Sequence, residues 1–222
     1  AGRRRAGRTG RPEQTIANLR SENRRTAGRG AAFARCERVG MGTVYISFCA
    51  EISFKTAQNL LGATLDQINK GASTIHYLFS TPGGTVQPGI ALYNVLKGLP
   101  INTVMQNVGA VDSIGNAVFL AGKRRIACPH STFMFHGVGL DVAGTTRLEE
   151  KSLRERLDGI KADQGKIGGI IADETALERT EVDSFFLEAK TKDAAFALDK
   201  GIVHEIAPVA VPAGARLLQL VF

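Results

Sequence analysis

The sequence has no tryptophan and only three cysteines among its 222 residues. Cys36, Cys49 and Cys128 are widely spaced and form no CxxC pair, which argues against a disulfide framework or a zinc site. No apolar run approaches the roughly 18 residues that span a bilayer, and no GxxxxGK[ST] phosphate loop occurs. From these absences we expect a soluble, cytoplasmic protein that binds neither a membrane, a metal nor a cofactor.

Basic charge is concentrated at one end of the chain. Residues 1–40 contain eleven Arg against three Glu, whereas residues 41–222 hold 17 basic and 18 acidic side chains. We interpret residues 1–40 as a flexible Arg/Gly-rich leader outside the fold, and residues 41–222 as one folded domain. An arginine-rich arm can neutralise phosphates or resemble a transit peptide, but this one has no Lys and little aromatic character for base stacking. Nucleic-acid binding is therefore not expected.

The rest of the chain alternates between β-branched or aromatic runs and amphipathic helical patterns. Strands are predicted at 43–50, 74–79, 102–108, 125–128, 132–136 and 201–206. Helices are predicted at 53–70, 87–99, 113–121, 181–190 and 193–200. Such alternation is typical of right-handed βαβ crossovers, so we expect an α/β fold with a largely parallel sheet.

Two further segments have apolar residues that need a partner. An apolar stripe predicts one long amphipathic helix over 145–172, formed by Leu153, Leu157, Ile160, Ile167 and Ile171. At about 40 Å it is longer than the sheet needs, so it either projects towards another subunit or is an ordinary surface helix kinked at its glycines. The apolar tail at 217–222 is expected to pack on its own or a neighbouring subunit, for example as a strand.

Three loops follow predicted strands, where ligands of open α/β sheets bind. Pro82-Gly83-Gly84 either only turns the chain or presents backbone N–H groups to a ligand. Ser113 heads a short apolar helix, as its N-cap or as a nucleophile in the field of the helix N-terminus. His136 ends an apolar strand, as a core residue or as a base.

In this order and spacing, the motifs resemble the proteolytic subunit of the Clp protease, the caseinolytic serine peptidases that share the spiral fold of the crotonase superfamily. The resemblance covers 43–206 and rests on Ser80-Thr81-Pro82-Gly83-Gly84, Ser113-Ile114-Gly115, Cys128-Pro129-His130-Ser131 and Met134-Phe135-His136. The intervals of 29 residues from Gly84 to Ser113 and of 23 from Ser113 to His136 fit the family. It implies a ClpP/crotonase-like spiral of βαβ units whose protruding handle helix is the segment 145–172.

The resemblance also assigns roles. Ser113 would be the nucleophile and His136 the general base, while the N–H groups of Gly84 and Ile114 would form the oxyanion hole. Substrate strands would lie beside Gly83, Gly84, Gly137, Val138 and Gly139.

The third member of the triad does not match. Counting back from Gly201 without gaps places Ala189 where the family has an Asp, and alanine cannot orient an imidazole. Glu188, one position earlier, is the preferred substitute and Asp183 the other candidate, whereas Asp193 is better suited to cap the following helix.

Asp112 is a second departure, since it puts a carboxylate directly before the nucleophile. It either points to solvent or disfavours the tetrahedral oxyanion. The resemblance as a whole predicts a serine endopeptidase that cleaves unfolded polypeptides or short peptides inside stacked heptameric rings, with an AAA+ unfoldase as partner. A weak or inactive ring subunit acting as scaffold or regulator is the alternative, and an acyl-CoA enzyme of the crotonase type is a third possibility.

Overall fold

The computed structural model describes Gly2, residues 41–142, Gly144, Arg147 and residues 149–222. The chain divides into two units, Ala1–Arg38 and Val39–Phe222, and every described helix and strand belongs to the second unit. Apart from Gly2, the predicted leader at 1–40 lies outside the described residues. Within the described ranges no helix is both long and apolar enough to cross a membrane.

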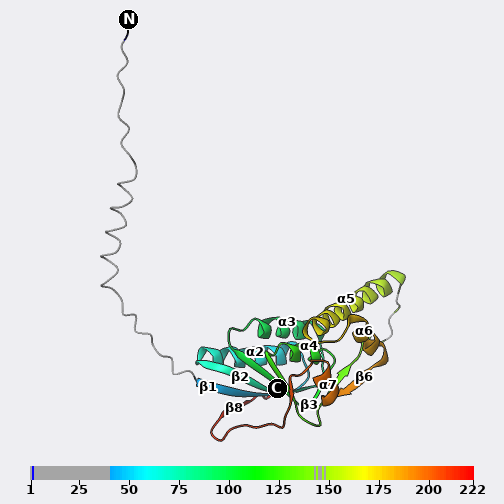
Figure 1. The fold of residues 1–222 in the computed structure, drawn as a ribbon. Helices are drawn as coiled ribbons and strands as arrows, with labels where there is room; N and C mark the ends of the chain where they lie inside the picture. The colour runs from blue at the N-terminus through cyan, green and yellow to red at the C-terminus, as the bar shows by residue number, and fades with distance from the viewer. Residues whose placement is uncertain (1, 3–40, 143, 145–146, 148) are drawn as a thin grey trace. The chain divides into compact units, whose positions relative to one another are not determined.

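The second unit is built from strands and helices that alternate along the chain (Figure 1). Its strands are β1 (Met41–Cys49), β2 (Ala72–Thr81), β3 (Asn102–Asp112), β4 (Arg124–Ala127), β5 (Thr132–Phe135), β6 (Lys190–Asp193), β7 (Glu205–Ile206) and β8 (Arg216–Gln219). Its helices are α2 (Phe54–Asn69), α3 (Val86–Lys97), α4 (Gly115–Leu120), α5 (Glu150–Glu174), α6 (Arg179–Glu188) and α7 (Ala194–Asp199).

The strands form one sheet in the order β6-β5-β3-β2-β1-β8, with β4 pairing β3 and β7 off this path. All pairings are parallel except that of β5 with β6, which is antiparallel. β3 changes partner along its length, because residues 104–107 pair with β4 and residues 110–112 pair with β5. The mixed α/β fold with a largely parallel sheet is confirmed.

The core lies between the sheet and the helices, and each of α2 to α7 contributes buried residues to it. Phe48 and Phe79 stack with ring centroids 5.3 Å apart on neighbouring strands, and Phe119 of α4 meets Phe133 of β5 edge to face at 5.2 Å. Every residue of α4 is buried, which is why its sequence has no charged side chain. The start of α4, which follows the end of β3, is therefore enclosed by the core.

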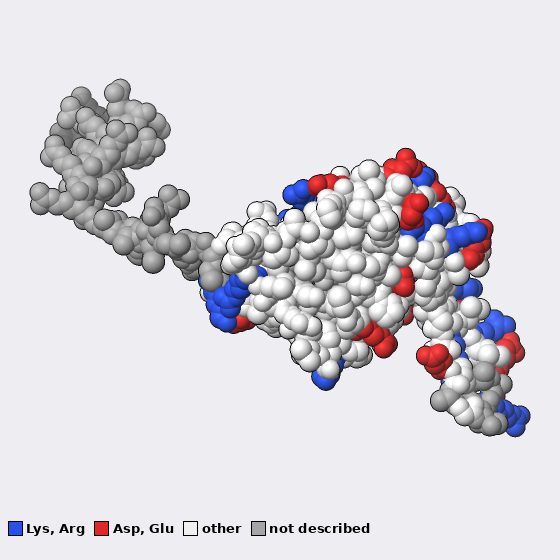
Figure 2. All heavy atoms as spheres, turned by 90° about the horizontal axis from the view of Figure 1, so that it is seen from below, with Lys and Arg blue, Asp and Glu red and all other residues white. Residues whose placement is uncertain are grey.

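The long helix α5 projects beyond the sheet at its N-terminal end (Figure 1). It begins at Glu150 rather than at 145, since Arg147 is not helical. Leu153 and Leu157 are 50% and 48% exposed on the projecting part, whereas Ile171 near the other end is buried. Figure 2 shows acidic and basic side chains gathered along this projection, while much of the neighbouring face is uncharged.

The C-terminal tail packs on its own subunit, as predicted. β8 extends the sheet by pairing in parallel with β1, and the Phe222 ring lies 5.4 Å from that of Phe48. The prediction of a helix up to residue 190 is wrong at its end, because α6 ends at Glu188 and the Lys-Thr-Lys-Asp stretch at 190–193 forms β6. Asp193 caps α7 as expected, accepting a hydrogen bond of 2.8 Å from the Phe196 N–H.

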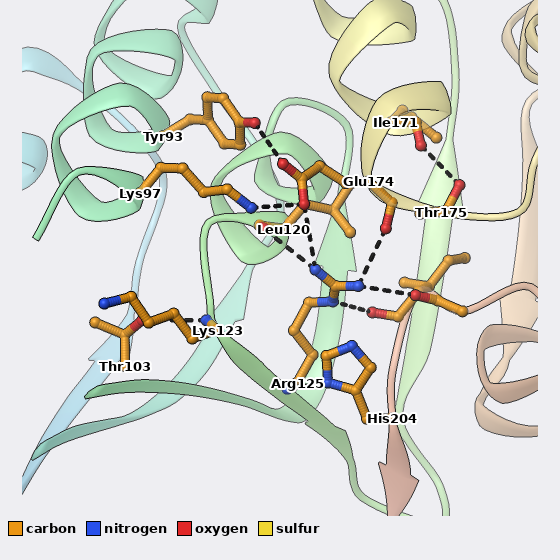
Figure 3. Close-up of polar contacts among 12 residues, drawn as sticks. Tyr93, Lys97, Thr103, Leu120, Lys123, Arg125, Ile171, Glu174, Thr175 and His204 are labelled. Carbon is orange, nitrogen blue, oxygen red and sulfur yellow. Dashed lines mark hydrogen bonds and ion pairs between the residues drawn. The ribbon is translucent and has the colours of Figure 1, made fainter. Parts of the chain in front are cut away.

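A buried guanidinium joins the C-terminal end of α5 to β4 and α3 (Figure 3). Arg125 is 6% exposed, and it donates to the carbonyls of Ile202 at 2.8 Å and Gly201 at 3.0 Å. It also donates to the Glu174 carbonyl at 3.1 Å, and its Nη1 lies 3.6 Å from Glu174 Oε2. The Glu174 carboxylate is thus the counter-charge of a cation that the fold removes from water.

The same carboxylate accepts hydrogen bonds from two side chains of α3, Tyr93 Oη at 2.9 Å and Lys97 Nζ at 2.6 Å. Burial raises the pKa of Glu174, but the hydrogen bonds from Lys97 and Tyr93 and the charges of Lys97 and Arg125 outweigh burial and hold it below its usual value. Burial, with the Glu174 contact, raises the pKa of Tyr93 to about 12, so its phenol remains a donor at neutral pH.

Glu174→Gln should lower the free energy of unfolding at neutral pH by about 2 kcal/mol, because the Arg125 cation loses its counter-charge. Since the pKa of Glu174 is lowered on folding, the native carboxylate stabilises fully above its unfolded pKa, and this contribution fades as the pH falls through the folded value. The difference between wild type and variant, measured by urea unfolding, should therefore shrink as the pH falls below the pKa of an unfolded glutamate.

The control is Glu150→Gln, which removes an exposed carboxylate paired with Arg154 on α5 and should change stability little at any pH. A wild-type advantage over Glu174→Gln that grows on acidification would contradict the assigned role.

Candidate active site

Ser113 lies in the turn between β3 and α4 with a left-handed backbone. Its φ of 57° is rare for a residue other than glycine, and Ala189 is the other such residue in the described part of the chain. Its N–H donates to the Met134 carbonyl at 2.9 Å, which joins the end of β3 to β5. A strained serine at the carboxyl end of a parallel strand is typical of a nucleophile held out from its sheet.

Glycines allow the neighbouring chain to approach this turn. A Cβ on Gly83 would lie 2.6 Å from Ser113 Cβ and 3.3 Å from Oγ. One on Gly89 would lie 2.3 Å from Ile114 Cγ1, and one on Gly115 would lie 2.4 Å from Thr81 Cγ2. The end of β2, the start of α3 and the serine turn are thus packed at distances that only glycine permits.

Gly84 lies at an exposed edge beside the serine. The backbone bonds to Ile52 are made by its neighbours, from the Ile52 N–H to the Gly83 carbonyl at 2.7 Å and from the Thr85 N–H to the Ile52 carbonyl at 2.8 Å. In a parallel bridge of this kind the intervening residue directs its own N–H to the opposite side. The N–H of Gly84 therefore faces away from Ile52.

His136 directly follows β5, and its position is set by the pairing of that strand. β5 is parallel to β3 with Asp112 opposite Met134, and antiparallel to β6 with Phe135 opposite Lys190. Among the described residues, the His136 ring makes no hydrogen bond to Ser113 Oγ. Such bonds are often long without substrate and tighten when it binds.

Asn116 fixes the two strands against each other. Its side-chain amide donates to the Ser113 carbonyl at 3.1 Å and to the Met134 carbonyl at 2.8 Å. It is 2% exposed, so these bonds form away from water. Sequence reasoning missed this residue, although an Asn inside an otherwise apolar helix is a signal that could have found it.

A cavity of about 520 Å³ opens beside Gly84, and neither Ser113 nor His136 is among its lining residues. Its lining brings Gly84 together with Val138 and Gly139, the segments expected to hold a substrate strand. The other lining residues are Glu51, Thr85, Val86, Gln87, Leu140, Asp141 and Asp163. Gly83 instead packs against Ser113, and Gly137 donates its N–H to the Phe186 carbonyl at 2.9 Å.

The carboxylates considered for the triad have other partners. Glu188 is exposed, accepts a hydrogen bond from Ser184 at 3.1 Å and pairs with Lys190 at 3.0 Å, and these contacts lower its pKa. Asp183 pairs with Arg179 at 2.9 Å. Within the described structure neither carboxylate contacts His136.

Asp112 is half-buried, and the charge of His136 acts on its carboxyl group. Burial raises the pKa of its carboxyl group, while the His136 ring and the Met134 backbone amide act in the opposite direction. Of the two alternatives raised from the sequence, full exposure to solvent does not fit the partly buried Asp112, and its effect on an oxyanion stays a prediction. As for metals, no group of three or more His, Cys, Asp and Glu side chains comes together within the described ranges.

The comparisons with known proteins agree with one another on one family. The family model for Clp protease matches residues 41–209. The chain is 27% identical over 161 residues to an ATP-dependent Clp protease proteolytic subunit 2 of Prochlorococcus marinus (strain MIT 9313), covering 69% of this chain and 80% of the relative. It is also 27% identical over 163 residues to subunit 3 of Synechococcus sp. (strain CC9902), with coverage of 70% and 80%.

Among solved structures, a ClpP1 mutant from Listeria monocytogenes superimposes with a TM-score of 0.63 at 22% identity, over 74% of this chain and 90% of that one. The fold is therefore that of ClpP. The chain belongs to the Clp protease family, as its motifs indicated, and it is a protease subunit of that family.

The close packing around the serine turn predicts the effect of one added methyl group. Gly89→Ala should lower the free energy of unfolding by about 1–3 kcal/mol, because its Cβ would overlap Ile114 and the packed core gives way poorly. Gly159→Ala is the control, since its Cβ would meet open space on α5 and alanine stabilises a helix by about 0.5–1 kcal/mol. Denaturant unfolding measures both, and equal stability of Gly89→Ala and wild type would contradict the packing argument.

Proposed function

We propose that this protein is a serine endopeptidase subunit in which Ser113 is the nucleophile and His136 the general base. The observation that carries the proposal is the left-handed serine at the end of β3, with the Gly83 backbone against its side chain and β5 beside it. Ser113 Oγ attacks the carbonyl carbon of the peptide bond and passes its proton to the His136 ring. His136 then gives that proton to the leaving amine, and water repeats the cycle on the acyl-enzyme.

The oxyanion of the tetrahedral intermediate accepts hydrogen bonds from the N–H groups of Gly84 and Ile114. Support comes from the direction of the Gly84 N–H away from Ile52 and from the position of Ile114 directly after the nucleophile. Donors already in place at the developing charge typically contribute about 3–4 kcal/mol each. Residues 138 and 139 border the cavity beside Gly84, where an extended substrate would lie.

Substrates are unfolded polypeptides or short peptides, and the active form is a ring assembly that receives them from an AAA+ unfoldase. The relatives' names as ATP-dependent proteolytic subunits support this reading. Exposed leucines on the projecting part of α5 support contact with a second copy of the chain.

A catalytically weak or inactive ring subunit is the second candidate. The exposed Ala189 favours it, because a triad without an orienting carboxylate typically loses several orders of magnitude in rate.

Intact-mass analysis after treatment with a fluorophosphonate distinguishes the two. If Ser113 is activated, the assembled protein gains one adduct, because only an activated serine attacks the phosphorus centre. Ser113→Ala should abolish the adduct, whereas Ser184→Ala, which changes a surface serine of α6, should keep it. A folded, assembled wild type that takes no label would overturn the peptidase assignment in favour of the inactive subunit.

Ring stacking through α5 is tested by placing charge on its apolar face. Leu153→Lys combined with Leu157→Lys should shift the assembly to about half its mass in sedimentation analysis, because two lysines on each copy would oppose each other across the contact. Lys161→Ala on the same helix is the control and should keep the full assembly. An unchanged mass in the double variant would show that α5 does not join the rings.

A further inference from the structure

The residue that would face His136 across the β5–β6 pair carries no carboxylate. Phe135 pairs with Lys190 in antiparallel register, so Ala189, the residue directly before β6, is the one that would come opposite His136 if the register continued. Ala189 is exposed, has φ 51° and ends α6 in a left-handed turn. The adjacent Glu188 is bound to Ser184 and Lys190. The β6 side therefore places no carboxylate directly opposite His136.

The other strand beside β5 is β3, and it brings Asp112. Asp112 is directly opposite Met134 in a parallel pair, and paired residues of adjacent strands direct their side chains to the same face of the sheet. Phe133 and Phe135 are buried in the core while Met134 lies on the other face, and His136 follows in this alternation. The carboxylate of Asp112 and the ring of His136 thus share a face.

The bonds around the turn hold this arrangement in place. The Ser113 N–H is bound to the Met134 carbonyl, and Asn116 binds the carbonyls of both residues. These contacts prevent a slip of β3 against β5, which would separate Asp112 from His136. In the described part of the chain Asp112 forms no ion pair with Lys, Arg or His, and its interaction with His136 is a longer-range attraction that lowers the pKa of Asp112.

We propose that Asp112 is the positioning carboxylate of His136 and takes the role that an acid at position 189 would have. This rests on the proposed peptidase function. In this role Asp112 accepts a hydrogen bond from one ring nitrogen, so that the other nitrogen can take the Ser113 proton. Asp112 remains ionised while the ring becomes an imidazolium, and no proton passes to the carboxylate.

The test is the second-order rate of fluorophosphonate labelling at Ser113 in assembled protein. Asp112→Asn keeps the shape of the side chain and removes its charge, and we expect it to label about 100-fold more slowly or worse. The double variant Asp112→Asn with Ala189→Asp should regain at least about 10-fold, since it restores a carboxylate beside His136 from the turn between α6 and β6. Aspartate tolerates the left-handed backbone at position 189.

Recovery of the labelling rate by a carboxylate from a different element of the fold is a result that a purely structural role of Asp112 would not give. Asp199→Asn, an exposed carboxylate at the end of α7, is the control and should label like wild type. If Asp112→Asn does not assemble, Asp112→Glu serves instead, and it should label more slowly and be rescued by Ala189→Asp.

The outcomes separate the two proposals. If wild type is labelled and Asp112→Asn labels equally fast or faster, the role of Asp112 is overturned, whereas the peptidase assignment stands. Slow labelling of Glu188→Gln beside normal labelling of Asp112→Asn also overturns it, in favour of Glu188. Wild type that takes no label overturns the peptidase assignment and with it the role of Asp112.

Discussion

The hydrogen bond from the Ser113 N–H to the Met134 carbonyl is the contact on which the rest of the site depends. It connects the last residues of β3 to β5, so the serine turn and the residue after β5 cannot move independently. Asn116 duplicates the link from the buried side of α4. Because buried hydrogen bonds are costly to leave unmade, this pair of strands resists fraying although only three of their residue pairs are in register.

The left-handed backbone at Ser113 is stabilised from outside the turn. A non-glycine residue in that region costs on the order of 1–3 kcal/mol and persists only where its surroundings fix it. Around Ser113 those surroundings are Gly83, Gly89 and Gly115, whose missing side chains admit Ser113, Ile114 and Thr81. The two glycines of the turn after β2 therefore have different roles. Gly83 leaves room for the Ser113 side chain in its left-handed conformation, and Gly84 lies exposed with its N–H directed away from Ile52.

Patterns of local sequence predicted most of the fold, because β1, β2 and α2 carry strong periodicity of their own. They could not predict β6, since Lys-Thr-Lys-Asp has no apolar alternation and becomes a strand only by pairing with β5. Motif spacing predicted Ser113, His136 and Gly84 as site residues. An ungapped count placed Ala189 where the family has an Asp, and the structure has this residue directly before β6, the strand that pairs with β5. The placement of Asp112 on the same face of the sheet as His136 was beyond both methods, because it depends on the register between β3 and β5.

A carboxylate next to a nucleophile has two opposite electrostatic effects. It repels the oxyanion that forms on the substrate and attracts the imidazolium that forms on His136, and both charges appear in the same step. Coulomb energy falls with distance, so the nearer partner decides the sign. In the proposed mechanism backbone donors hold the oxyanion on the Gly84 side of the serine, whereas the Asp112 carboxylate shares its face of the sheet with His136. Asp112 is half-buried, and solvent screens a short-range interaction of a half-buried charge less than a longer-range one. The interaction of Asp112 with its nearer partner is therefore strengthened most. The same residue that departs from the family pattern is thus placed to compensate for the missing acid at position 189.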